Sequence, residues 1–274
     1  EDLTGLVAGT YDVLVTDNNG CTETESHTIT EPTGMEIALD ASFIDLLCFN
    51  DADGTLNVTV TGGTPIYTYL WTTADGAIPA GQETSEDLTG LVAGDYTVVV
   101  TDDSGCIITD TYTINEPDDL VINLLSMSED LLCASDSDGN IDIDVTGGTP
   151  TYTYLWTTVD GIIPTGQETS QDLTGLVAGT YDVLVTDDNL CTETDTYTIS
   201  EPSDLTVEVD PSSTSELDCF TDSDGVININ VGGGTITYTY LWTTADGAIP
   251  AGQETNEDLT GLVAGTYDVL VTDN

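Results

Sequence analysis

Residues 87–101 read DLTGLVAGDYTVVVT, and this stretch decides the fold. In its second half Tyr96, Val98 and Val100 occupy every other position. Apolar side chains at a period of two are typical of a β-strand with one buried face. The intervening residues, Thr97 and Val99, are β-branched and fit a pleated surface. The stretch therefore predicts a half-buried strand that begins just after a glycine turn.

The same stretch recurs along the chain and defines a long repeat. The motif DLTGLVAG begins four times, at a step of 85 or 86 residues, at Asp2, Asp87, Asp172 and Asp258. Because this period is too long for a solenoid turn, it predicts one small β-sandwich per repeat. We expect two complete repeats, at 33–117 and 118–202. Residues 1–32 read as the C-terminal part of a truncated repeat, and 203–274 as the N-terminal part of another.

The two ends of the sequence carry the same segment. Residues 1–18 and residues 257–274 both read EDLTGLVAGTYDVLVTDN. The pattern thus returns to its starting point part-way through a repeat. We interpret the chain as a window on a longer tandem array, with repeats of the same kind before and after it.

The other strands of each repeat follow the same alternation. Residues 62–71, GGTPIYTYLW, place Tyr67, Tyr69 and Trp71 on one face after a Gly-Gly turn. The Tyr of LVAGDY stands where a tyrosine corner of an immunoglobulin-like sandwich would be, with its hydroxyl bonded to upstream backbone. We predict an all-β chain of tandem immunoglobulin-like β-sandwich domains in a linear rod. The predicted core and tyrosine-corner residues are Trp71, Trp156, Trp242, Tyr96, Tyr181 and Tyr267.

The ordered set of motifs resembles a known family. The repeat pattern is Cys-x5-Gly, a strand, GGTPxYTYLW, DLTGLVAGxYxVxVTD, a short turn, Cys, and finally Glu-Pro. This pattern resembles the SprB-type repeat of the giant gliding and cell-surface adhesins of the Bacteroidota. Two departures are the missing Pro at Ile236 and the long loop at 72–86. The resemblance implies export, display as extracellular surface filaments, a role in gliding or attachment, and no enzymatic activity.

Six cysteines in a chain of this kind predict disulfides, in one of three arrangements. In the first arrangement the bonds lie within a repeat: Cys48–Cys106 and Cys133–Cys191. In the second they cross a linker: Cys21–Cys48, Cys106–Cys133 and Cys191–Cys219. In the third they join successive repeats, as in Cys48–Cys191. Buried free thiols are the remaining alternative. A strand of seven residues spans about 23 Å, whereas bridged Cα atoms lie within about 7 Å. Because the two cysteines of a repeat are expected at opposite ends of the sandwich, we favour Cys48–Cys191.

An Asp-Xxx-Asp-Gly turn follows the first cysteine of each repeat. Carboxylates around such a turn are what calcium requires, although the distal ligands of a full calcium loop are missing, and a plain solvated turn explains the pattern as well. Calcium at the junctions between repeats is the functional interpretation. Its candidate ligands are Asp51, Asp53, Asp136, Asp138, Asp222, Asp224, Asp187 and Asp188.

Charge excludes several classes of function. The chain has 51 Asp and Glu, one His and no Lys or Arg, which gives a formal charge of −51. No cation is available to neutralise a phosphate, so we expect no binding to nucleic acid, and we expect no membrane insertion. The one histidine, His27, lies in a strand at a position that is Tyr in other repeats, and no catalytic set recurs. We therefore predict a non-enzymatic structural stalk. The alternative is a multivalent module whose exposed loops, above all 72–86, bind glycans or other cells.

Overall fold

The computed structural model describes residues 2–42, 44–212, 214–215, 217–219 and 221–273. The structure is all-β, and these described residues contain no helix. Two units, Glu1–Asp119 and Leu120–Asn274, each hold most of their contacts internally. The predicted all-β fold of tandem immunoglobulin-like sandwiches is confirmed. The strand pairing and the core described below carry that conclusion.

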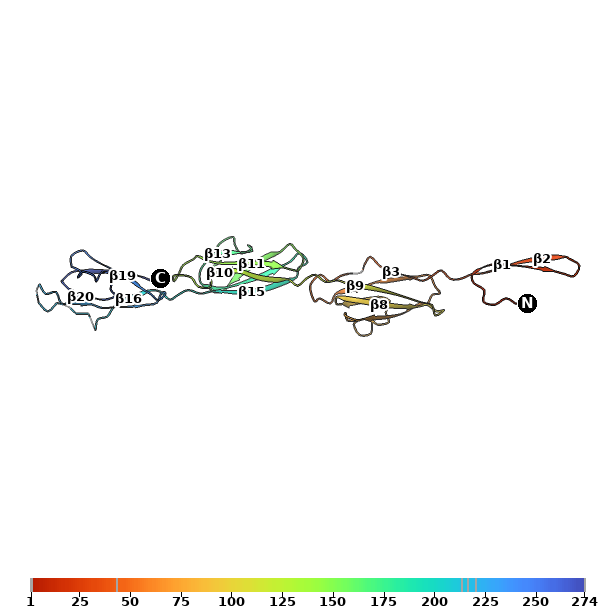
Figure 1. The fold of residues 1–274 in the computed structure, drawn as a ribbon, viewed down its shortest axis with the longest axis horizontal. Helices are drawn as coiled ribbons and strands as arrows, with labels where there is room; N and C mark the ends of the chain where they lie inside the picture. Colours follow the sequence, from red (N-terminus) through yellow and green to blue (C-terminus); the bar gives the residue numbers. More distant parts are fainter. Residues whose placement is uncertain (1, 43, 213, 216, 220, 274) are drawn as a thin grey trace. The chain divides into compact units, whose positions relative to one another are not determined.

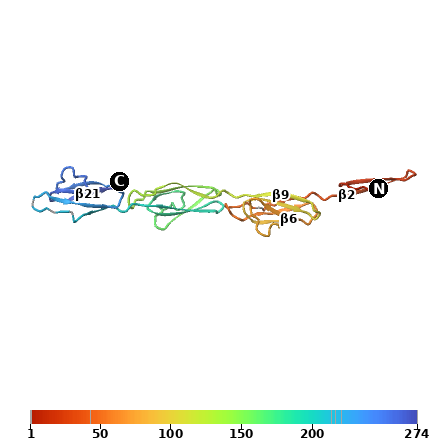
Figure 2. The same ribbon diagram turned by 60° about the horizontal axis from the view of Figure 1, so that its bottom comes forward.

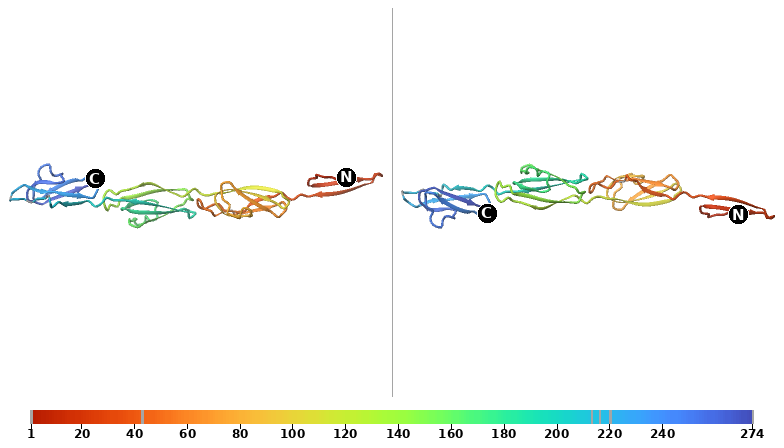
Figure 3. Two further views of the ribbon diagram at one scale, coloured as in Figure 1. Left: turned by 90° about the horizontal axis from the view of Figure 1, so that it is seen from below. Right: turned by 90° about the horizontal axis from the view of Figure 1, so that it is seen from above.

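The first unit contains a hairpin and one sandwich. Its strands are β1 (Gly9–Thr16), β2 (Thr22–Ile29), β3 (Glu36–Leu39), β4 (Gly54–Leu56), β5 (Val58–Thr61), β6 (Thr68–Thr73), β7 (Leu88–Leu91), β8 (Gly94–Thr101) and β9 (Ile107–Ile114). Strands β1 and β2 form an antiparallel hairpin by themselves (Figure 3). One sheet of the sandwich has the order β6-β8-β9, and the other is built from the pairs β3-β5 and β4-β7 (Figures 1 and 2).

The second unit contains a complete sandwich and part of another. Its strands are β10 (Val121–Met127), β11 (Gly139–Thr146), β12 (Thr153–Thr158), β13 (Leu173–Leu176), β14 (Gly179–Thr186), β15 (Thr192–Ile199), β16 (Thr206–Val209), β17 (Gly225–Ile227), β18 (Ile229–Gly232), β19 (Thr239–Thr244), β20 (Leu259–Leu262) and β21 (Tyr267–Thr272). The complete sandwich packs the sheet β10-β11-β13 on the sheet β12-β14-β15. In residues 203–274 the corresponding sheet has two described strands, β19 and β21.

The first long segment of a sandwich pairs with two different strands, one along each half of its length. The alternation at 55–60 predicts one continuous strand, but in the first unit it is divided at Asn57 into β4, which pairs with β7, and β5, which pairs with β3. At the division Val58 N donates a hydrogen bond to Asp87 Oδ1 at 3.1 Å. The carboxylate satisfies an amide that the ladder leaves unpaired, and an unpaired buried amide is costly. The same bond recurs at Ile143–Asp172 (3.1 Å) and Ile229–Asp258 (3.0 Å).

The core of each sandwich surrounds the Trp of its GGTPxYTYLW segment. Trp71, Trp156 and Trp242 are buried, and the indole N–H of Trp71 donates to Ser85 O at 3.0 Å. Strand β8 contributes Tyr96, whose hydroxyl donates to Val92 O at 2.8 Å, four residues upstream. The corresponding bonds are Tyr11–Val7, Tyr181–Val177 and Tyr267–Val263, all at 2.8 Å. Burial raises the pKa of the Tyr96 and Tyr181 hydroxyls, which keeps them as donors.

Candidate functional site

The candidate site is formed by the two ends of each sandwich, and the first end carries the cysteine loop. We give this name to residues 48–54 and their equivalents 133–139 and 219–225. Asp51 N donates to Cys48 O at 3.3 Å, and Asn50 has a left-handed φ of 59°. Asp136 and Asp222 make the same bond to Cys133 O and Cys219 O. The loop is therefore a regular turn that presents its cysteine at the start.

A glutamate of the following linker fastens the cysteine loop. Asn50 N donates to Glu116 Oε2 at 2.8 Å, and Ser135 N donates to Glu201 Oε2 at 2.6 Å. Both glutamates belong to the Glu-Pro linkers that follow the last strand of a repeat. The bond spans 66 residues of sequence, so the local pattern gives no sign of it. The recurrence of Glu-Pro at a fixed distance from the cysteine loop is the signal that could have predicted it.

The other end of the sandwich carries the hairpin turn, residues 102–106 and their equivalents. The Asp102 carboxylate accepts from Thr64 N (2.9 Å) at one oxygen and from Ser104 N (3.0 Å) and Cys106 N (2.8 Å) at the other. These backbone hydrogen bonds, that of Thr64 above all, lower the pKa of Asp102. The side chain is 5% exposed. Asp102 thus holds the hairpin turn and its cysteine in one conformation.

Asp187 has the same role in the next repeat. Its carboxylate accepts from Thr149 N at 2.7 Å and from Cys191 N at 2.8 Å, and it is 3% exposed. The sequence analysis predicts Asp187 and Asp188 as candidate calcium ligands. In the structure Asp187 already binds two backbone amides through both of its oxygens, while Asp188 is exposed.

The Gly-Gly turn holds the start of the incoming linker against this end. Gly63 N donates to Thr33 O at 2.7 Å, and Gly62 has a φ of +77°. A Cβ added at Gly62 would lie 2.0 Å from Gly34 O, so only glycine allows this approach. At Gly233 the added atom would lie 1.8 Å from Asp204 O. In these two repeats a glycine turn therefore binds the linker where the linker enters the sandwich.

Within the second unit the two kinds of end lie next to each other. One pocket is lined by Cys133 and Ala134 of a cysteine loop and by Leu205, Gly234 and Asp273 of the following repeat. Desolvation raises the pKa of the Cys133 thiol, and the carboxylates of Asp136 and Asp273 raise it further. In this pocket a cysteine loop lies next to Asp273, which corresponds in sequence to Asp102 and Asp187.

The cysteines are in two states. Cys48 and Cys191 are disulfide-bonded. The other four have free thiols and are exposed: Cys21, Cys106, Cys133 and Cys219. The within-repeat pairings Cys48–Cys106 and Cys133–Cys191 and the linker pairings Cys21–Cys48, Cys106–Cys133 and Cys191–Cys219 are therefore wrong. The alternative prediction, that the cysteines are buried free thiols, is wrong as well, because all four free thiols are exposed.

Strand length explains why the within-repeat bond fails. The Asn50–Glu116 hydrogen bond places the cysteine loop beside the residues that follow β9, whereas Cys106 directly precedes β9. Strand β9 has eight residues, which span about 26 Å. Bridged Cα atoms must lie within about 7 Å of each other. The pairing of Cys48 with Cys191 that the sequence favours stays a prediction.

The acidic turns are not gathered into clusters. Among the described residues no group of three or more His, Cys, Asp and Glu side chains is close enough to hold a metal ion. Four candidate ligands are exposed: Asp51, Asp53, Asp138 and Asp224. Asp136 and Asp222 are half-buried. Calcium at the junctions stays a prediction.

The loop at 72–86 folds back over the core tryptophan. Trp71 N donates to Glu83 O at 2.8 Å, and the Gln82 side chain bonds both the N and the O of Thr89 (2.8 and 3.1 Å). In the third repeat the corresponding loop leaves Val159 89% and Ile162 64% exposed. His27 is exposed on β2, opposite Tyr11.

Three segments match one family model, the SprB repeat: residues 41–76, 126–161 and 212–247. Each begins just before a cysteine loop and extends past the core Trp of its sandwich. The predicted resemblance is thereby confirmed at these three places. A search of curated proteins finds no match.

Solved structures with similar tandem folds have low sequence identity to this chain. The N-terminal eight Ig domains of Down Syndrome Cell Adhesion Molecule align over 97% of this chain and 50% of that chain, with 11% identity and a TM-score of 0.36. Dpr2 Ig1–Ig2 in complex with DIP-Theta aligns over 86% and 95% (11%, TM-score 0.33). Clostridium thermocellum CbhA fibronectin(III)-like modules align over 61% and 95% (13%, TM-score 0.25). Among the described residues no helix has the length and apolar character to cross a membrane.

Proposed function

We propose that this chain is a structural stalk segment of a secreted cell-surface adhesin, without catalysis. One observation carries the proposal: the match to the SprB repeat recurs at a step of 85 or 86 residues, and each match covers the same part of a β-sandwich. Such a segment spaces an adhesive part from the cell and works in gliding or attachment. Its partners are the preceding and following repeats of the same chain, and its location is extracellular.

The linker contacts support a mechanical role. The linker within the second unit is held at both ends: Glu201 accepts a hydrogen bond from Ser135 N of the cysteine loop that it leaves, and Ser203 O accepts one from Gly234 N of the sandwich that it enters. Ordering a linker at both ends removes conformational freedom that a flexible linker would keep. We infer that the repeats resist bending at these points.

A disulfide between successive repeats would strengthen this resistance. Cys48 and Cys191 are both disulfide-bonded, and the other four cysteines are free, which supports the favoured pairing of these two with each other. The bond closes a loop of roughly 140 residues and restricts the unfolded chain most when loops are long. The uniform negative charge of −51 also opposes collapse and entanglement of neighbouring stalks.

Single-molecule force spectroscopy tests the stalk function. With the Cys48–Cys191 bond closed, about 140 residues are shielded from extension at up to about 3.5 Å each, so reductant should add about 500 Å of contour length. Cys48→Ser should show the longer length without reductant, and Cys219→Ser, a change at a free thiol, should behave like the original chain. Equal contour lengths with and without reductant would exclude this bond.

The second candidate function is a multivalent glycan-binding or cell-binding module. The exposed Val159 and Ile162 of the long loop favour it. The bonds that Gln82 and Glu83 make inside the equivalent loop of the preceding repeat leave those side chains less able to bind a sugar. A glycan array probed with the chain at millimolar ligand distinguishes the two, because a stalk segment should bind none of the glycans.

A further inference from the structure

Two carboxyl groups lie on one face of the 118–202 sandwich, at the place where β13 begins to pair with β11. The pair of residues at this end of the ladder is Ile141 with Leu173, and both are buried. The next pair in the same register is Asp142 with Asp172. Because side chains alternate between the faces of a sheet, both aspartates point away from the core. We call this place the seam of the sandwich.

The two carboxyl groups at the seam are in contact. Asp172 Oδ1 accepts a hydrogen bond from Ile143 N at 3.1 Å, and the Asp142 carboxyl is hydrogen-bonded to the Asp172 side chain. Partial burial raises the pKa of Asp142, and the charge of Asp172 raises it further. A hydrogen bond between two carboxyl groups needs a proton, because an ionised carboxylate is an acceptor only. The contact between Asp142 and Asp172 is therefore attractive only while the pair keeps one proton.

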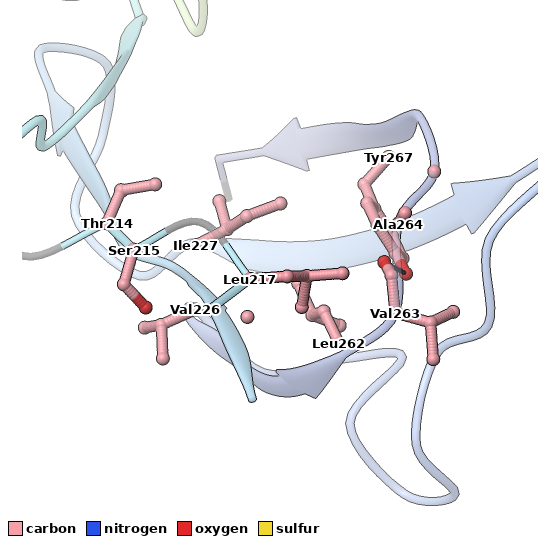
Figure 4. Close-up of a pocket in the computed structure, with 11 residues that line it drawn as sticks. Thr214, Ser215, Leu217, Val226, Ile227, Leu262, Val263, Ala264 and Tyr267 are labelled. Carbon is pink, nitrogen blue, oxygen red and sulfur yellow. Dashed lines mark hydrogen bonds between the residues drawn. The ribbon is translucent and has the colours of Figure 1, made fainter. Parts of the chain in front are cut away.

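The other two sandwiches have an asparagine at the position of Asp142. The equivalent pairs are Asn57 with Asp87 and Asn228 with Asp258, and each of these aspartates accepts the same backbone hydrogen bond as Asp172, at 3.1 and 3.0 Å. Figure 4 labels Ile227, which directly precedes Asn228, and Leu262 of the neighbouring strand β20. Among the three seams that the structure describes, two carboxyl groups therefore face each other in the 118–202 sandwich alone.

The residue before the second aspartate changes together with Asp142. In the first unit it is Glu86, whose Oε1 accepts a hydrogen bond from the Tyr69 hydroxyl at 2.9 Å. In the 118–202 sandwich it is Gln171, whose side-chain amide donates to Ile143 O. A carboxylate at this position could not donate that bond. The sandwich thus exchanges an acidic residue beside the seam for one directly opposite Asp172.

No basic side chain can neutralise the pair, because the chain contains no Lys or Arg. The groups around it are Ser126 of β10, Asp144 of β11, Gln171, and Tyr154 of β12. The charge of Asp144 raises the pKa of Asp142, while a hydrogen bond with Ser126 lowers it. Burial and the charges of Asp172 and Asp144 raise the pKa of Tyr154, so its hydroxyl stays neutral. A proton is therefore the counter-charge that these surroundings leave to the pair.

We propose that Asp142 and Asp172 share one proton, and that loss of this proton weakens the seam of the 118–202 sandwich as the pH rises. With the proton present, the Asp142 O–H donates to the Asp172 carboxylate, which still accepts from Ile143 N. Without it, two carboxylates repel each other, and like charges directly opposite on neighbouring strands are destabilising. This inference goes beyond the proposed stalk function and does not depend on it.

The sign of the effect follows from the direction of the pKa change. Because the pKa of Asp142 is raised in the folded chain, its contribution to stability is complete below the unfolded pKa of about 3.9. That contribution is lost as the pH rises through the folded pKa. The seam of this sandwich therefore responds to pH in the opposite sense to the turn aspartate Asp102, whose pKa is lowered.

Urea unfolding of the full chain between pH 4.5 and pH 8 tests the proposal, with a chelator present so that no divalent ion bridges the carboxylates. Trp71→Phe and Trp242→Phe leave Trp156 as the fluorescent reporter of this sandwich. Asp142→Asn, which installs the residue of the other two seams, should raise the folded-to-unfolded ratio about twofold to fivefold at pH 8. The gain should shrink towards pH 4.5. Glu193→Gln removes one charge from an exposed position of β15 and should change the ratio equally at both pH values.

Hydrogen exchange tests whether the effect lies at the seam. The amides of Ile143 and Val58 each donate to an aspartate at 3.1 Å, but Val58 follows Asn57 and not an aspartate. Protection of Ile143 relative to Val58 should fall about twofold to fivefold between pH 4.5 and pH 8, and Asp142→Asn should remove this fall. Equal pH responses of Asp142→Asn and Glu193→Gln, or a protection ratio that stays constant with pH, would overturn the proposal.

Discussion

The sequence GTYDVLVT occurs three times in the chain, at 9–16, 179–186 and 265–272, and its three copies differ in burial. In the complete sandwich Val183 and Val185 are at most 1% exposed. In residues 203–274, Val269 and Val271 are half-buried. In the hairpin Val13 is 47% exposed and Val15 is 61% exposed. Local sequence makes the same strand each time, and the elements packed against it decide its burial.

The last strand accounts for much of the difference between the second and third copies. In the complete sandwich the rings of Trp156 and Tyr197 lie 6.0 Å apart, and Tyr197 comes from β15. Tyr181 is fully buried there, whereas Tyr267 is half-buried in residues 203–274. A single strand therefore closes the core on one side. Among the described residues β1 and β2 pair with each other alone, and most of their side chains are exposed.

Hydrogen exchange followed by mass spectrometry should separate the three copies most widely. Since their sequences are identical, their intrinsic exchange rates are nearly equal, and protection reports the surroundings alone. We expect 181–185 to be protected at least about a hundredfold more than 11–15, because burying two Val side chains contributes about 3 kcal/mol or more. Residues 267–271 should fall between them. Equal protection in all three would contradict the comparison.

Removing one side chain of the last strand should make the complete sandwich resemble the open one. Ile199→Ala in the 118–202 sandwich should cost about 2–5 kcal/mol of unfolding free energy, because Ile199 is 1% exposed and its loss leaves a cavity. The matched control is Val159→Ala, at a residue that is 89% exposed, and its effect should stay within about 0.5 kcal/mol. Urea unfolding followed by tryptophan fluorescence, in a background where Trp71 and Trp242 are replaced by Phe so that Trp156 alone reports, measures both. A loss as large in the control as in Ile199→Ala would show that the core does not depend on this strand.

Sequence alone predicts the strands and the repeat because both depend on local alternation and spacing. It predicts Trp71 and Tyr96 as core residues from their place in the alternation. The division of the first strand at Asn57 is not predictable this way, because apolar residues alternate without interruption through the point where the strand changes partner. Alternation reports which face is buried and says nothing about which neighbour is paired.

The candidate site was harder to predict because its contacts are long-range. Glu116 bonds the backbone of Asn50, and Asp102 bonds Thr64, at separations of 66 and 38 residues. In a chain without Lys or Arg, a carboxylate finds its donors among backbone amides. The abundance of acidic residues suggested a cation between them, and the structure instead shows several of them as hydrogen-bond acceptors for turns. An Asp four residues before a Cys marks such a turn, as in Asp102–Cys106 and Asp187–Cys191.

The tyrosine corner allows the buried and exposed copies of GTYDVLVT to be compared through one hydroxyl group, that of Tyr181 or Tyr11. Tyr181→Phe removes the bond to Val177 O inside the complete sandwich and should cost about 1 kcal/mol of unfolding free energy. Tyr11→Phe removes the same 2.8 Å bond in the exposed hairpin, where water replaces it, and should leave the sandwiches unchanged. Chemical denaturation of the two variants side by side is the measurement. A cost for Tyr11→Phe equal to that for Tyr181→Phe would mean that burial does not set the value of this bond.

The pH dependence of the hairpin turn is the smallest expected effect. Because the pKa of Asp102 is lower in the folded chain than the usual value of about 3.9, the folded state favours the ionised carboxylate. Its contribution to stability is therefore complete above the unfolded pKa and is lost as pH falls through the folded pKa. Thermal unfolding between pH 2 and pH 7 should show this loss, and Asp102→Asn should lower the melting temperature at pH 7 while reducing the change on acidification. Asp103→Asn alters the exposed neighbour in the same turn and should reproduce the original profile, so an equal flattening by both variants would assign the effect to net charge and not to the three backbone amides that Asp102 binds.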